Sequence, residues 1–123
     1  MANPNIVNVT AIYGNTVNVS LTTTSETSVL SNAASSSVVY KVDNIVVANT
    51  TGTSATITIN VHSAAALGGT AYPIASSITI PAYSTLIVTD KSTAFYLTEN
   101  MSIGATAGTA SALVVTASYE NIS

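Results

Sequence analysis

The single histidine of the chain, His62, is the residue type best suited to acid–base chemistry at neutral pH. With a carboxylate such as Asp43 or Asp90 and one of the many serines, it could form a catalytic triad. The sequence around these serines lacks the strand–turn–helix context that exposes a nucleophilic serine, and in so serine-rich a chain some serine lies near any histidine. We therefore interpret His62 as an ordinary histidine that faces solvent at the end of a strand.

The carboxylates are the other groups that could carry chemistry: Glu26, Asp43, Asp90, Glu99 and Glu120. Glycoside hydrolysis needs two of them as a pair, one protonated and one ionised. Calcium binding needs several oxygen ligands in one loop, for which Asp43-Asn44 and Glu99-Asn100 are the candidates. The five groups are scattered over predicted turns and strand ends, and no loop is densely acidic. We expect no catalytic residue, no cofactor and no metal site.

Charged residues make up 6% of the 123 residues, whereas a soluble domain usually has about 25%. Hydrophobic residues account for 47%, and most of the remainder is Ser, Thr and Asn. Nucleic-acid binding is disfavoured because it needs clustered basic residues, and the chain has a net charge of −3 and only two basic residues. The scarcity of reactive groups favours a structural or interaction protein over an enzyme.

The length is that of one domain, so we expect residues 1–123 to form a single unit with residues 1–5 as an N-terminal arm. There is no cysteine, so stability must come from packing and backbone hydrogen bonds. No apolar run approaches the roughly 18 residues of a membrane span, and the start lacks the basic and apolar segments of a signal peptide. We expect synthesis in the cytoplasm and no membrane partner.

Alternation of apolar and polar residues predicts strands along most of the chain. The segments 7–13 and 17–21 are predicted to form a hairpin about Gly14-Asn15. The nearly continuous apolar stretch 38–48 is predicted to be the core strand and to pair as a hairpin with the strand 55–61, whose Ile57 and Ile59 point inward. The segment 64–69 is predicted to be a flexible loop because paired glycines end it. Further strands are predicted over residues 72–80, 85–89, 94–97, 101–107 and 112–119.

Eight to ten short strands without a convincing helix predict an all-β fold, a single antiparallel β-sandwich. The strand count favours a jelly-roll-like arrangement, and an immunoglobulin-like one is the alternative, because strand order does not follow from the pattern. Such a sandwich has exposed sheet edges, and two lysines are too few to protect them all. We therefore hypothesise that the edges are covered in a fixed assembly.

Six tyrosines offer apolar area with a polar tip, which suits protein or sugar binding. The absence of tryptophan weakens the sugar interpretation. By strand phase, Tyr13, Tyr40 and Tyr119 are predicted to be core residues. Tyr72 and Tyr83 flank turns and are the better candidates for an interface.

Four parts of the chain carry a resemblance to a known group of proteins: residues 2–10, residues 38–49, Ile80-Pro81-Ala82 with Leu86-Ile87-Val88, and residues 118–122. The sequence resembles small virion structural proteins of tailed bacteriophages of the marine and cyanophage type. The likeness covers nearly the whole length but consists of framework residues rather than a chemical signature.

The resemblance implies a capsid decoration (cement) protein that binds the outer capsid lattice, with the major capsid protein as partner and a homotrimer as its own assembly. An alternative within the virion is a neck, tail or fibre protein that binds a host surface or glycan, and an alternative outside it is a free carbohydrate-binding module. Binding to the lattice would stabilise the head by ordinary linkage. We expect the contacts in segments 1–9 and 64–72, with Tyr83 in addition. The individual interface candidates are Asn3, Pro4, Asn5, Ile6, Leu67, Tyr72 and Tyr83.

Overall fold

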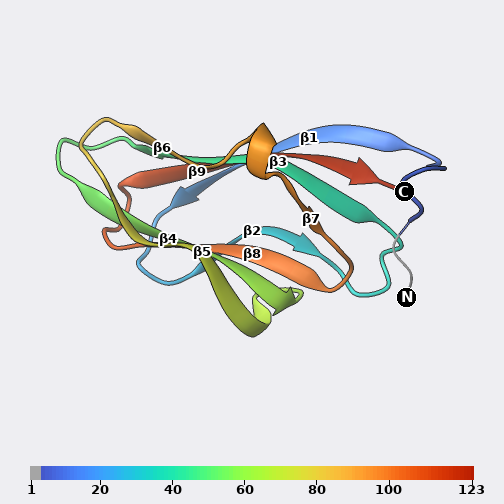
Figure 1. Ribbon diagram of the computed structural model, residues 1–123. Helices are drawn as coiled ribbons and strands as arrows, with labels where there is room; N and C mark the ends of the chain where they lie inside the picture. Colours follow the sequence, from blue (N-terminus) through green and yellow to red (C-terminus); the bar gives the residue numbers. More distant parts are fainter. Residues whose placement is uncertain (1–3) are drawn as a thin grey trace.

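A computed structural model describes residues 4–123 as two antiparallel β-sheets packed face to face (Figure 1). The first sheet has the strand order β1-β9-β3-β6, and the three-residue strand β7 also pairs with β3. Its strands are β1 (Ile12–Leu21), β9 (Leu113–Ile122), β3 (Val39–Asn49), β6 (Thr85–Thr89) and β7 (Phe95–Leu97). This sheet is called sheet A below.

The second sheet, sheet B, has the order β2-β8-β4-β5. Its strands are β2 (Thr27–Asn32), β8 (Met101–Ala107), β4 (Ala55–Ala64) and β5 (Gly68–Ile80). A single turn of 3-10 helix, η1 (Lys91–Thr93), is the only helical element within residues 4–123. No helix in that range is long and apolar enough to cross a membrane.

The strand pairs identify the topology as a jelly roll. When the short strand β7 is left out, strands pair from the two ends of the chain inward. The pairs are β1 with β9, β2 with β8, β3 with β6 and β4 with β5. Successive pairs alternate between the two sheets, as when one long hairpin is rolled up. The predicted antiparallel sandwich is confirmed, and the strand order is that of the jelly roll.

The core lies between the sheets and is built from alternate residues of each strand. Ile57 and Ile59 of β4 are fully buried, as the alternation predicts, and Val42, Ile45 and Val47 of β3 are buried as well. The segment predicted to be the core strand is therefore confirmed, with a bulge between Val42 and Asn44 that restores the inward phase.

Two buried asparagines hold the connections between the sheets. Asn49 donates from Nδ2 to the carbonyl oxygens of Thr53 and Ile80 at 2.8 and 3.1 Å, and its Oδ1 accepts from the amide of Thr51 at 3.0 Å. Asn32 donates likewise to Val38 and Leu97, both at 3.0 Å. Each amide is satisfied by backbone groups, so burial of these polar side chains fixes the loops where the chain changes sheets.

Two predicted hairpins are wrong. The backbone passes straight through Gly14 and Asn15, because the whole segment 12–21 pairs with β9 instead of folding back on residues 7–11. The segments 39–49 and 55–64 lie in different sheets, and the turn between them carries the chain across the sandwich. Strand β2 was not predicted, since its bulge buries both Val29 and Leu30 and breaks the alternation.

The core assignment makes a direct prediction. Ile59→Ala should lower the free energy of unfolding by about 2–5 kcal/mol, because it leaves a cavity at a fully buried site. The matched control is Ile87→Ala in β6, where the side chain is 62% exposed and the expected loss is below about 0.5 kcal/mol. Urea unfolding measures both, and equal losses would contradict the assignment of the core.

Candidate interaction surface

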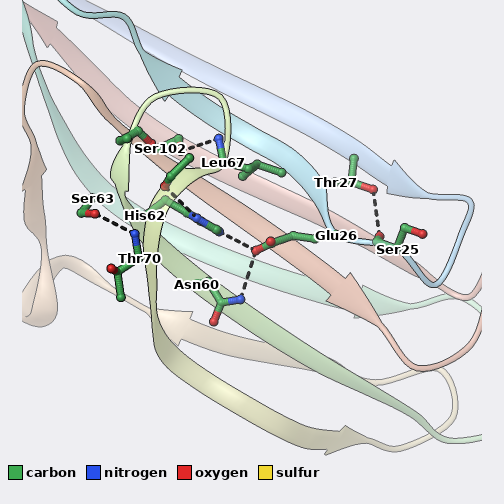
Figure 2. A network of polar contacts seen from close by, with 11 residues as sticks. Ser25, Glu26, Thr27, Asn60, His62, Ser63, Leu67, Thr70 and Ser102 are labelled. Carbon is green, nitrogen blue, oxygen red and sulfur yellow. Dashed lines mark hydrogen bonds and ion pairs between the residues drawn. The ribbon is translucent and has the colours of Figure 1, made fainter.

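The strongest polar cluster lies on the outer face of sheet B, where His62 of β4 meets Glu26 from the loop before β2 (Figure 2). His62 Nε2 lies 2.8 Å from Glu26 Oε2, and Asn60 Nδ2 donates to the same oxygen at 3.0 Å. His62 is 4% exposed, so the prediction that it faces solvent is wrong. The residue lies at the end of a regular β segment, but Glu26 and the β4–β5 turn cover it.

Both ring nitrogens of His62 face oxygen acceptors, since Nδ1 lies 3.2 Å from the carbonyl oxygen of Gly68. A protonated imidazole donates from both nitrogens and satisfies both contacts, whereas the neutral ring donates to only one. The carboxylate partner is Glu26 rather than Asp43 or Asp90, and no hydroxyl shares a hydrogen bond with the ring among those shown for residues 4–123. The geometry is that of a clasp between two segments and not of a nucleophile with its base.

The pKa of Glu26 reflects this environment. Partial burial acts to raise it, but the hydrogen bonds from His62 and Asn60 and the nearby charge of His62 outweigh burial and lower the pKa below its ordinary value. The side chain lies directly over Gly104 of β8, where a methyl group would meet Glu26 Cδ at 2.7 Å and Cγ at 2.8 Å. Glycine at this position therefore provides the space for the clasp.

The turn between β4 and β5 is fixed by side chains from β2, from β8 and from the loop before β8. Three successive backbone amides donate to side-chain oxygens: Ala65 to Asn100 at 3.1 Å, Ala66 to Ser31 at 3.0 Å and Leu67 to Ser102 at 2.9 Å. Ser102 Oγ also donates to the carbonyl oxygen of Ala64 at 2.7 Å. The segment 64–69, predicted to be a flexible loop, is thus a turn held by hydrogen bonds, which we call the tied turn.

Charged residues are distributed unevenly over the sheets. The four edge strands β1, β6, β2 and β5 contain no Asp, Glu, Lys or Arg, and neither does β7 beside β6. The charges that occur in strands are on the internal strands β3 and β9: Lys41, Asp43 and Glu120. Charges on an edge are a common protection against pairing with another chain, and here the edges lack them.

Large apolar side chains are exposed near the same edges. On β1 these are Ile12 and Tyr13, at 54% and 65% exposure, and on β6 and β7 they are Ile87 and Tyr96. Strand β5 exposes three more: Tyr72, Ile74 and Ile78. These side chains give the edges at β1, β5 and β6 with β7 an apolar border of the kind found at protein interfaces, whereas β2 has none.

The candidate interface residues do not form one patch. Pro4 and Ile6 line a shallow apolar hollow with Val39, Tyr96 and Thr98, beside exposed Asn5. Leu67 is partly exposed in the tied turn. Tyr72 and Tyr83 are 58% and 76% exposed, the latter in the loop that packs on Gly52. Asn3 lies outside the described residues.

Sequence reasoning missed two features of this surface. Tyr13 was predicted to be a core residue and is exposed, because nothing covers either face of the first half of β1, where residues 12–16 are all exposed although β9 pairs with them. Tyr40 and Tyr119 do pack against the core, with ring centroids 5.0 Å apart. The His62–Glu26 clasp joins positions 36 residues apart, and no local pattern marks such a pair. Within residues 4–123, no group of three or more His, Asp or Glu side chains could hold a metal ion.

No protein-family model and no curated protein matches the sequence. Among solved structures, a chain of Bacillus endospore appendages, described as disulfide-linked pili, is similar with a TM-score of 0.50 and 16% identity over 90% of this chain and 86% of that one. A chain of the infectious bursal disease virus particle has a TM-score of 0.52 and 8% identity over 93% of this chain, which corresponds to 31% of that protein. At these identities the two likenesses show a shared fold.

A third chain, from the capsid of cyanophage Pam1, is 15% identical over 99% of this chain and 91% of that one. Its TM-score is 0.37, which is too low to carry an argument about fold or role.

The clasp predicts a pH dependence. Because the folded pKa of Glu26 is lowered, the clasp contributes stability above the unfolded pKa and loses it as the pH falls through the folded value. We expect the free energy of unfolding to fall between roughly pH 5 and pH 3 by about 1–2 kcal/mol more than in Glu26→Gln, which keeps the shape without the charge. Subtracting the two unfolding curves removes the contributions shared by both proteins, including that of Asp90. Parallel pH profiles would contradict the clasp.

The space above Gly104 gives a second test. Gly104→Ala should destabilise the fold by about 1–3 kcal/mol, because the new methyl group displaces Glu26 from His62. Gly14→Ala in β1 is the matched control, since a methyl group there meets nothing within 4 Å. Thermal unfolding compares the two, and in a Glu26→Ala background the cost of Gly104→Ala should largely disappear. A cost that persists in that background would show that Glu26 is not the cause.

Proposed function

We propose that this chain is a non-enzymatic structural protein of a virus particle, and specifically a decoration protein that binds the outside of a capsid lattice. The single observation that carries the proposal is the absence of charge from every sheet edge, while the strand charges lie on internal strands. Charged side chains at the edges are one of the protections that keep free soluble proteins from edge-to-edge association. A protein whose edges are covered by neighbours does not.

The topology supports the viral part of the proposal. Jelly rolls are common in viral capsid proteins, although lectins and cupins share them, so topology alone does not decide between these roles. Two solved structures of similar fold come from assemblies, one a pilus and the other a virus particle. The resemblance of the sequence to small phage virion proteins favours the particle over the pilus.

A second candidate role keeps the protein in the virion but places it at the neck, tail or fibre, where it binds a host surface or glycan. The exposed Tyr72 and Tyr83 favour this role, because tyrosine can stack on a sugar ring and hydrogen bond through its hydroxyl group. Saturable binding to a glycan array would support it.

The decoration role predicts that the protein copurifies with intact particles, in a fixed copy number relative to the major capsid protein. Deletion of residues 1–5 should lower occupancy on purified heads several-fold while leaving the fold intact, because this segment precedes the strands and supplies Pro4 to the apolar hollow. The matched control is Lys91→Ala in the exposed turn η1, which should leave occupancy unchanged. Quantitative mass spectrometry of particles gives both values. Absence from particles would overturn the proposal, and unchanged occupancy after the deletion would remove the arm from the contact.

A further inference from the structure

Three of the four sheet edges are protected by their geometry. Strand β5 is long, but it contains Pro73, several register shifts against β4, and Ser77 with a φ of 49°. Strand β2 has six residues and a bulge at Val29, and β6 has five residues. Bulges, proline and short length all hinder the addition of another strand.

Strand β1 has none of these protections. It is ten residues long, pairs with β9 at every position from Ile12 to Leu21 without a register shift, and contains neither proline nor charge. Within residues 4–123 it is the one edge strand that is long, regular and uncharged. Its outer row of backbone N–H and C=O groups is therefore a ready template for another strand.

The first half of β1 has few contacts within its own subunit. All residues from Ile12 to Thr16 are exposed, and Ile12 and Tyr13, as neighbours in a strand, point to opposite faces of the sheet. Neither face is covered there, and β9 pairs with one side only. An added strand would pair the backbone and cover part of both side chains.

We propose that β1 is a self-association edge, on which a second copy of this chain adds its own β1 in antiparallel orientation and joins the two A sheets into one continuous sheet. This goes beyond the proposed function and does not depend on it, because the contact would exist in the isolated protein.

The neutrality of β1 is the reason to assign a second copy rather than another protein. In an antiparallel pair about a two-fold axis, each residue faces another residue of the same strand, so any charge near the axis would meet a like charge. Strand β1 has none, and a net charge of −3 per copy adds little repulsion. A partner of different chemistry would find no charge on β1 to recognise.

The outward polar side chains of β1 are already ordered for such a pair. Asn18 Oδ1 accepts from Thr116 Oγ1 at 2.8 Å, and Thr16 Oγ1 lies 3.3 Å from Ser118 Oγ. Because β9 holds these side chains, pairing with a second β1 orders few additional groups, which lowers the entropic cost of association.

The first test measures the mass of the full chain by light scattering and native mass spectrometry over a range of concentrations. We expect a dimer whose dissociation constant rises at least about tenfold in the double variant Thr16→Lys and Asn18→Lys, which places like charges opposite each other in the pair. The control is Ser76→Lys with Thr79→Lys on β5, which adds the same charge to the protected edge and should leave the dimer unchanged. Circular dichroism of both variants verifies that each has folded.

The second test uses the absence of cysteine from the chain, so that any disulfide reports an introduced pair. Three single-cysteine variants are oxidised mildly: Asn15→Cys, Thr16→Cys and Asn18→Cys. The variant whose cysteine lies nearest the two-fold axis should form a covalent dimer, because there the two copies of the residue lie within disulfide range. Ser76→Cys on β5 should not.

Three results would overturn the proposal: a monomer at all concentrations, an assembly that the β1 lysines leave intact, or a trimer. A two-fold contact gives even-numbered assemblies, so a trimer, as implied by the resemblance to decoration proteins, would need a different contact. If the isolated protein is a monomer and β1 binds a capsid lattice, the partner at this edge is the capsid shell and not a second copy of the chain.

Discussion

A strand at the edge of a sheet pairs its backbone on one side only, and its second row of N–H and C=O groups must meet water or another chain. Two open sheets give this molecule four such edges, and none of them carries a charged side chain. Proline, bulges and short length protect three of them, and β1 is left regular and open. The assembly proposed for this protein follows from this one feature.

The connections inside the fold also rely mainly on neutral side chains. Polar groups at the crossings between sheets are satisfied by neutral amides, as at Asn32 and Asn49, and the outer turn after β4 is held by serine and asparagine oxygens. The clasp of His62 and Glu26 is different, because there two ionisable groups pair with each other. A rigid framework with little charge suits a part that binds once and stays bound.

The sequence predicts individual strands well and their partners poorly. Alternation around Ile57 and Ile59 identifies β4 and its inward face, because a strand with one buried face must repeat every two residues. Alternation carries no information on which strand lies alongside, so the segments 38–48 and 55–61 were predicted to pair, although the topology puts β3 and β4 in different sheets. Gly14-Asn15 resembles a turn locally, but ten consecutive pairings with β9 outweigh that preference. Glu26 and His62 meet only because the jelly roll brings the β1–β2 connection over β4.

Hydrogen exchange of the full chain in its native assembly, followed residue by residue, tests most directly whether neighbours cover the edges. The account predicts that the amides of β1 between Ile12 and Val19 that point away from β9, which are those of every second residue, exchange as slowly in the assembly as the amides of the internal strand β9, and faster by orders of magnitude after dilution to the isolated chain. Rapid exchange along β1 in both states would contradict it.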